Sequence, residues 1–151
     1  MFIIRKGTWC DFIMKYFGRL EITTKIGCKC NCLYCPQDLL IKNYYNRNLN
    51  PIPDKAMTIE TFKICISKVP KDTRIDFSGM AEPWLNADCT DMVLYAHKMG
   101  FPIAVYSTLI GMSRNDFDLI KDIPFEEFVV HIPDEKGNAR IDITNDYIDL
   151  L

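Results

Sequence analysis

The order of apolar and polar residues along the chain separates short strands from amphipathic helices. Runs rich in β-branched and aromatic residues are typical of strands, and apolar residues spaced three and four apart are typical of helices. The strand pattern occurs at 20–26, 73–78, 101–108 and 127–132. The helix pattern occurs between these segments, at 58–69, 86–98 and 113–123. This strict alternation predicts an α/β fold with about four parallel strands.

Capping and breaking residues mark where the predicted helices begin and end. Thr58 and Ser113 are suited to cap the first and third helices, and Gly100 is suited to end the second. A further helix is expected to begin at Thr144 or Asn145.

Segments outside this pattern are harder to read. Residues 8–17 predict either a short helix or an extra strand. A short helix is expected at 39–41, and 43–50 is expected to be an exposed connection that carries function.

Chemically reactive residues follow the predicted strands at their carboxyl ends, where ligands gather in parallel sheets. The first strand is followed by four cysteines within residues 28–35, and the second by the segment 79–83. Ser107 and Thr108 close the third strand, and His131 closes the fourth. We therefore expect one functional site at this edge of the sheet.

The bulk composition narrows the class of protein. The 151 residues are 48% hydrophobic and 25% charged, which is ordinary for a globular domain. The net charge of -2 gives no electrostatic case for nucleic-acid binding. No apolar run has the length of a membrane span, and the N-terminus lacks the pattern of a signal peptide. We expect a cytoplasmic, reducing location, where clustered cysteines bind metals rather than form disulfides.

The cysteine loop has a spacing suited to an open metal centre. Three residues separate Cys28 from Cys32, and two separate Cys32 from Cys35. Thiolates suit zinc and iron–sulfur centres. Three thiolates from one loop can hold three corners of a cubane cluster, which leaves its fourth iron free for an outside ligand.

This spacing, with Tyr34 before the last cysteine, resembles the signature of the radical S-adenosylmethionine (radical SAM) superfamily. Gly79-Met80-Ala81-Glu82-Pro83 is similar to that family's glycine-rich motif, although Met80 and Ala81 stand where a second glycine is expected. Ser107-Thr108-Leu109-Ile110-Gly111 is a looser match to the family's motif after the third strand.

The resemblance implies a 4Fe–4S cluster held by Cys28, Cys32 and Cys35. It also implies S-adenosylmethionine (SAM) as cofactor, with Gly79 and Glu82 at its methionine end and Tyr34 near its adenine. Ser107, Thr108 and His131 are further expected contacts. The implied reaction is reductive cleavage of SAM to a 5′-deoxyadenosyl radical, driven by a low-potential electron donor such as flavodoxin or ferredoxin.

The resemblance covers residues 20–134, so we expect an N-terminal extension at 1–18 and a partial radical SAM barrel at 19–151. The family barrel usually has six strands, and the motifs of its last two are missing from this sequence. The fourth strand would then be an open edge for a dimer or a partner chain to cover. The loop and the Glu82-Pro83 pair look closest to the peptide-maturing, SPASM-type group, and a short activase of glycyl-radical enzymes is a second option.

Other interpretations of the cysteine loop stay open. A structural zinc site normally pairs two ligand clusters, whereas Cys65 and Cys89 lie apart in predicted helices. Cys30 is either the fourth ligand of a closed ferredoxin-like cluster or a thiol that binds no metal. A non-catalytic cluster- or zinc-binding fragment that docks on a partner is the leading alternative to an enzyme.

Overall fold

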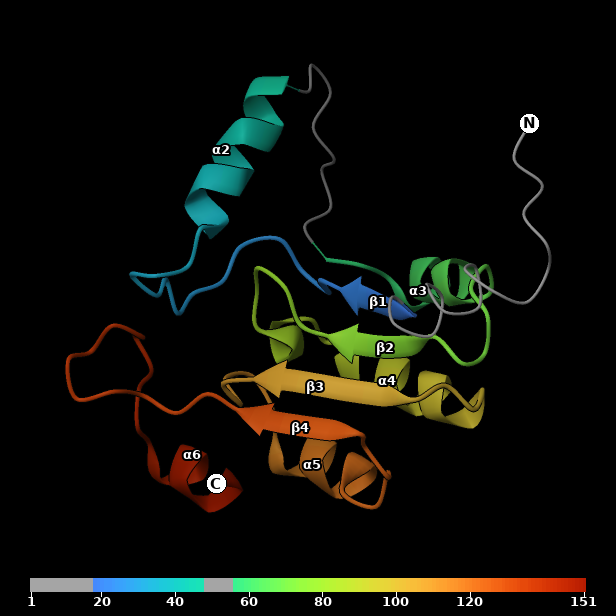
Figure 1. The fold of residues 1–151 in the computed structure, drawn as a ribbon. Coiled ribbons are helices and arrows are strands. Elements are labelled where there is room, and N and C mark those ends of the chain that lie inside the picture. Colours follow the sequence, from blue (N-terminus) through green and yellow to red (C-terminus); the bar gives the residue numbers. More distant parts are fainter. Residues whose placement is uncertain (1–17, 48–55) are drawn as a thin grey trace.

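A computed structural model describes residues 18–47 and 56–151. The predicted helix or strand at 8–17 and residues 1–17 of the predicted extension at 1–18 lie outside the described residues. A single sheet of four parallel strands forms the centre of the fold, in the order β1-β2-β3-β4 (Figure 1). The strands are β1 (Arg19–Ile22), β2 (Arg74–Phe77), β3 (Ile103–Ser107) and β4 (Glu127–Val130). The predicted α/β fold with four parallel strands is therefore confirmed.

Five α-helices and one 3-10 turn accompany the strands in the described part of the chain. They are α2 (Gln37–Arg47), α3 (Ile59–Ile66), the turn η1 (Pro83–Leu85), α4 (Cys89–Lys98), α5 (Arg114–Ile120) and α6 (Asn145–Leu150). Thr58, Ser113 and Thr144 cap α3, α5 and α6 through their side chains, as predicted. No helix in these ranges is long and apolar enough to cross a membrane.

The hydrophobic core lies between one face of the sheet and the helices α3, α4 and α5 (Figure 1). From the strands, Ile22, Ile75, Phe77, Ile103 and Val105 are buried in it. From the helices, it takes Phe62, Ile66, Met92, Val93, Ala96 and Ile120. Sequential strand order with helices on one face is the arrangement of a barrel wall rather than of a doubly wound sheet.

The opposite face of the sheet is polar, because side chains alternate between the two faces of a strand. β2 has the sequence Arg74-Ile75-Asp76-Phe77, so its two apolar residues enter the core and its two charged residues face the other way. Arg19 and Glu21 are paired in register with Arg74 and Asp76 and share this face. It is here called the open face of the sheet.

Two predicted boundaries were wrong for reasons that involve distant residues. The first strand ends at Ile22 instead of 26, because the buried Thr24 donates its hydroxyl to Pro83 O at 2.8 Å. The second helix begins at Cys89 instead of 86, because Asn86 Nδ2 donates to Thr24 O and Met57 O, both at 2.8 Å.

The helix after the cysteine loop is also longer than the predicted 39–41. α2 extends to Arg47, so 43–47 is helical although its described side chains are exposed. Residues 48–50 of the predicted connection lie outside the described residues. Cys89 is buried as expected of a small hydrophobe, whereas Cys65 is only half-buried and Cys10 lies outside the described residues.

Candidate functional site

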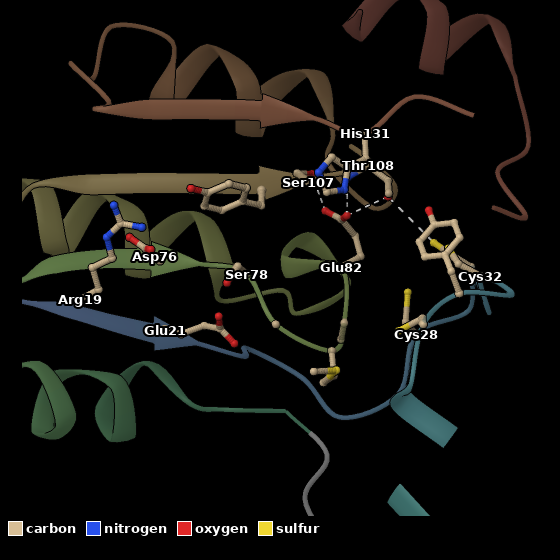
Figure 2. A pocket seen from close by; sticks show the side chains of 17 residues that line it. Arg19, Glu21, Cys28, Cys32, Asp76, Ser78, Glu82, Ser107, Thr108 and His131 are labelled. Atoms are coloured by element: carbon tan, nitrogen blue, oxygen red, sulfur yellow. Dashed lines mark hydrogen bonds between the residues drawn. The ribbon is translucent and has the colours of Figure 1, made fainter. Parts of the chain in front are cut away.

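A cavity of about 450 Å³ lies at the carboxyl edge of the sheet and extends over its open face (Figure 2). The loops after β1, β2, β3 and β4 each contribute to its wall. All nine residues predicted from the sequence line it: Cys28, Cys32, Tyr34, Cys35, Gly79, Glu82, Ser107, Thr108 and His131. The fold thus brings the predicted residues together, and their individual roles stay predictions.

The cysteine loop is braced from within by Gln37, the first residue of α2. Gln37 is 3% exposed, its Oε1 accepts a hydrogen bond from Cys28 N at 2.8 Å, and its Nε2 donates to Cys28 O at 3.2 Å. Both backbone groups of Cys28 are therefore held by one buried amide, which fixes where the first thiol of the loop lies.

The segment after β4 holds the same loop from outside. Leu33 N donates to Asn138 O at 2.9 Å, and Arg140 N donates to Cys30 O at 3.2 Å. Asp134 supports this segment, because its Oδ1 accepts hydrogen bonds from Lys136 N and Asn138 Nδ2. Asp134 is thus occupied in shaping the segment.

The pKa values of the Cys28 and Cys30 thiols are shifted in opposite directions. A side-chain hydrogen bond from Cys30 lowers the pKa of Cys28 to about 5 against the opposing effect of burial, and backbone groups of Glu82, Cys30 and Asn31 lower it further. The pKa of Cys30 is raised, first by the same hydrogen bond and then by burial. Cys28 is therefore disposed to be a thiolate, the form that binds metals.

Cys30 differs from the other three cysteines in its surroundings. It is 1% exposed, and its Sγ lies 4.0 Å from Thr108 Oγ1. All four thiols line the cavity, but Cys28, Cys32 and Cys35 are half-buried whereas Cys30 is buried. In the residues that the structure describes, no three acidic, histidine or cysteine side chains already stand in a metal-binding arrangement.

Glu82 connects the loop after β2 to the end of β3. Its carboxylate accepts hydrogen bonds from Ser107 Oγ at 2.6 Å, Thr108 N at 2.6 Å and Thr108 Oγ1 at 2.8 Å (Figure 2). The residue is 5% exposed. Burial raises the pKa of Glu82, and the three hydrogen bonds oppose that rise. Ser107 and Thr108, predicted as ligand contacts, thus direct their hydroxyls to Glu82.

Gly79 is required by the shape of the loop after β2. Its φ of +99° is a conformation that residues with a side chain rarely adopt. A Cβ at this position would lie 1.9 Å from Thr23 Oγ1 and 3.4 Å from Glu21 Oε1. The backbone of the glycine loop therefore lies close to β1 and the residue that follows it. Only a glycine at position 79 allows this close approach.

Tyr34 and His131 stand at the rim of the cavity. Tyr34 is 66% exposed, and a hydrogen bond to Cys32 is the main cause of a raised pKa of its hydroxyl. His131 is exposed, and its backbone N–H donates to Ser107 O at 2.8 Å, which extends the pairing of β3 with β4. The structure therefore places the His131 side chain at the cavity, where it has no hydrogen bond to the residues that the structure describes.

Sequence reasoning missed the charged residues of the open face. Arg19, Glu21, Asp76 and Tyr106 all line the cavity. The alternation of charged and apolar residues in 19–22 and 74–77 was the available signal. This alternation predicts strands with one polar face, but it does not indicate which cavity that face lines.

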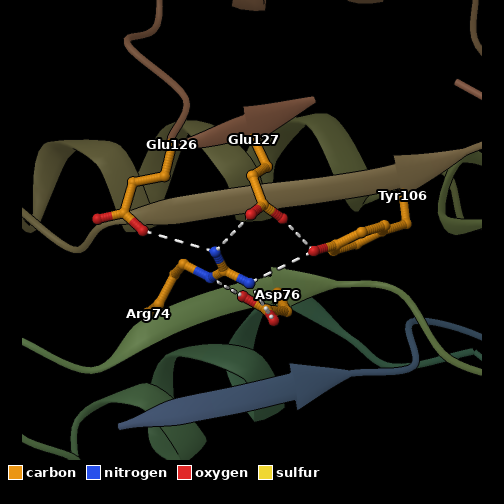
Figure 3. Close-up of polar contacts among 5 residues, drawn as sticks. All are labelled: Arg74, Asp76, Tyr106, Glu126 and Glu127. Atoms are coloured by element: carbon orange, nitrogen blue, oxygen red, sulfur yellow. Dashed lines mark hydrogen bonds and ion pairs between the residues drawn. The ribbon is translucent and has the colours of Figure 1, made fainter. Parts of the chain in front are cut away.

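On the open face of the sheet, Arg74 forms hydrogen bonds and ion pairs with polar side chains of β2, β3 and β4 (Figure 3). Its Nε and Nη2 donate to the two carboxylate oxygens of Asp76 at 2.6 and 3.0 Å, and its Nη1 lies 3.4 Å from Glu127 Oε1. Tyr106 OH donates to Glu127, and Arg74 Nη2 donates to Tyr106 OH at 3.4 Å. Asp76 is therefore a compensated charge, even though it is only 7% exposed.

The donor set fits a thiolate-bound cluster next to a small polar ligand. Three half-buried thiols face the cavity, and one of them has a pKa low enough to be ionised at neutral pH. The positive φ of Gly79 exposes loop backbone beside them. This combination suits a metal centre whose outside ligand is held by the protein.

Two solved structures share this fold. The crystal structure of BtrN in complex with AdoMet and 2-DOIA matches with a TM-score of 0.54 at 17% identity, over 76% of this chain and 45% of that chain. Selenomethionine BtrN in an open conformation matches equally well, over 76% and 49%. The chain thus spans about half the length of these proteins. No family model and no curated protein matches the sequence. The likeness shows the fold alone, which is that of a partial radical SAM barrel.

Proposed function

We propose that this chain is the core of a radical SAM enzyme. Cys28, Cys32 and Cys35 hold a 4Fe–4S cluster, and the loop of Gly79 and Glu82 holds the methionine end of SAM. One observation carries the proposal: the three thiols and the glycine loop line one cavity at the carboxyl edge of a partial radical SAM barrel. The two solved structures with this fold support it, since one of them is a complex with AdoMet.

The residues of this chain supply position and electrostatics. Gln37 fixes the backbone of Cys28, and Asn138 and Arg140 hold the outside of the cysteine loop. Glu82 joins the glycine loop to Ser107 and Thr108, so that the second and third loops are held together. Such support is what a cluster with an open position needs from its protein.

When bound, the cluster and SAM supply one-electron cleavage of the SAM sulfonium, which yields methionine and a 5′-deoxyadenosyl radical that takes a hydrogen atom from the substrate. The electron comes from a low-potential donor of the flavodoxin or ferredoxin class. A peptide or protein substrate is the hypothesis that follows from the SPASM-like sequence resemblance, and a glycyl-radical enzyme is the second.

The open edge of β4 supports the need for a partner. In the described part of the chain, β4 pairs with β3 and with no other strand. Apolar residues near this edge are solvent-exposed, among them Phe128 at 36% and Ile132 at 65%. Exposed strand edges readily pair with another chain. We therefore propose that a second copy or a partner chain covers β4 in the active assembly.

The experiment that tests the ligand assignment is anaerobic reconstitution with iron and sulfide. Wild type and Cys30→Ala are expected to take up about four of each per chain, because Cys30 lies inside the Cys28–Cys32 spacer and is 1% exposed, although it also lines the cavity. Cys32→Ala is expected to lose the cluster. Loss in Cys30→Ala with retention in Cys32→Ala would contradict the assignment.

A zinc- or cluster-binding protein without SAM chemistry is the competing function. It is favoured by the four clustered thiols of Cys28, Cys30, Cys32 and Cys35, which all line the cavity and include a fourth potential ligand. Purified protein that holds zinc and takes up no iron would establish this alternative. Formation of 5′-deoxyadenosine from SAM by the iron-loaded protein would exclude it.

A further inference from the structure

The cavity extends from the cysteine loop over the open face of the sheet as far as Arg19, the first residue of β1 (Figure 2). The proposed function places the cluster and SAM at the loop end, and the part over β1 and β2 is left for the substrate; the inference about that part rests on the proposed function. Arg19 is the register partner of Arg74, and Ser78 lies about 13 Å further along β2 at roughly 3.3 Å per residue. A substrate that reaches Arg19 from the loops is therefore an elongated molecule.

Arg74 is fully engaged on the open face (Figure 3). Its guanidinium donates to both carboxylate oxygens of Asp76 at 2.6 and 3.0 Å, and it lies 3.4 Å from Glu127 and 3.7 Å from Glu126. Acidic side chains of the protein therefore offset its positive charge, and Arg74 is not available to a ligand.

Arg19 has no such partner. It is exposed and lines the cavity, and among the described residues its side chain forms no hydrogen bond and no ion pair within 4.0 Å. Among the groups that lower the pKa of Glu127, the hydrogen bond from Tyr106 comes first, Arg74 next and Arg19 last. The guanidinium of Arg19 thus keeps its five donors and its charge for another molecule.

The position of Arg19 is unfavourable for the fold. It stands in register with Arg74 on the same face of the sheet, and like charges directly opposite each other on neighbouring strands are destabilising. No described contact of Arg19 compensates for this repulsion. A charged residue that weakens the fold and holds no other residue in place is suited to bind a ligand.

The charges around Arg19 indicate which anion it would bind. A guanidinium binds carboxylates and phosphates in a bidentate arrangement. In the described part of the chain, Arg19 is the only lysine or arginine that lines the cavity, and Glu21 and Asp76 line the same part of it. A phosphate with two negative charges would meet one free cation and two carboxylates, so electrostatics favour the singly charged carboxylate.

We infer that Arg19 binds a carboxylate of the substrate at the end of the cavity away from the cysteine loop. Arg19 thereby selects elongated, acidic substrates, and it is a specificity-determining residue of the proposed enzyme. For a peptide substrate, the carboxylate is that of an acidic side chain or of the C-terminus.

The test compares two probes that differ only in charge, N-acetyl-triglycine and its C-terminal amide, each about 10 Å long when extended. Their binding to the reconstituted protein with SAM is measured by NMR titration. Wild type is expected to prefer the carboxylate by about 10-fold, the worth of a charge-assisted hydrogen-bonded pair. Arg19→Met is expected to lose this preference and to bind the amide as wild type does. Arg19→Lys is expected to keep only part of the preference, because an ammonium lacks the planar fork of a guanidinium.

Two controls accompany the test. Arg47→Met, the same change at an exposed arginine at the end of α2, is expected to keep the preference. Arg19→Met is expected to unfold at a urea concentration no lower than wild type, because the substitution relieves the repulsion with Arg74. A clear loss of stability would show that Arg19 serves the fold, and would overturn the inference.

Failure of the inference and failure of the proposed function are distinct. A wild type that binds both probes equally, or binds neither, overturns the assignment of Arg19, and so does a preference that survives in Arg19→Met. The same preparations are assayed for 5′-deoxyadenosine formed from SAM with dithionite. If wild type with its cluster forms none, the proposed function fails, whatever the two probes show.

Discussion

Gly79→Ala is the substitution that probes the glycine loop most directly. Gly79 has a φ of +99°, and an added Cβ would lie 1.9 Å from Thr23 Oγ1 and 3.1 Å from Thr23 Cβ. Both the backbone conformation and the contact oppose a methyl group. The variant is therefore expected to unfold at lower denaturant concentration than wild type, before any cofactor is considered.

The expected cost has two parts. An L-residue held at positive φ costs about 1–2 kcal/mol. Relief of the contact with Thr23 requires a side-chain rotation and a small backbone shift, which typically costs about 1–3 kcal/mol. The sum is about 2–5 kcal/mol of unfolding free energy, measured by urea denaturation of the metal-free protein.

Two further variants separate these parts. Gly100 has a φ of +78° with nothing within 4 Å of an added Cβ, so Gly100→Ala is expected to show the backbone cost alone. Thr23→Ala removes the nearest atom and is expected to restore about 1–2 kcal/mol to Gly79→Ala, within the overpacking cost. The reasoning is refuted if Gly79→Ala costs no more than Gly100→Ala, or if Thr23→Ala restores nothing.

Three other outcomes are expected in denaturation experiments. Burial raises the pKa of Glu82 above 4.5, so protonation of Glu82 stabilises the folded protein fully below pH 4.5, and this stabilisation is lost as pH rises through the raised pKa. Wild type should therefore gain unfolding free energy relative to Glu82→Gln as pH falls from 7. A difference between the two proteins that stays constant with pH would argue against this burial. Arg74→Met should cost about 3–5 kcal/mol by leaving Asp76 buried without its cation, and Arg74→Met/Asp76→Asn should recover most of it; equal losses in both would contradict that cause. Ser113→Ala should cost about 1 kcal/mol through the capping box with Asp116, and an unchanged midpoint would show that the cap is not formed.

Local signals in the sequence predicted the elements of this fold well. Thr58, Ser113 and Thr144 cap their helices with their own side chains, so the information lies within three residues of each start. The parallel direction of the strands was predicted by their alternation with helices. Boundaries set by distant partners were not predictable, since Thr24 and Asn86 hold each other's segments across about 60 positions of sequence.

The site shows the same division between local and distant information. The cysteine spacing and the glycine loop identified the residues that meet at the cavity, because each loop directly follows a strand. The use of Ser107 and Thr108 as partners of Glu82 depends on how two loops pack, which no spacing reveals. The partners of the Asp76 and Glu82 carboxylates likewise depend on how strands and loops pack.

The central claim is tested most directly by the formation of 5′-deoxyadenosine. Anaerobically reconstituted protein is mixed with SAM and dithionite, and the product is measured by liquid chromatography with mass spectrometry. Wild type is expected to form 5′-deoxyadenosine, and Cys32→Ala, which lacks a cluster ligand, is expected to form none. Wild-type protein that holds a full 4Fe–4S cluster and binds SAM, yet forms no 5′-deoxyadenosine, would contradict the account.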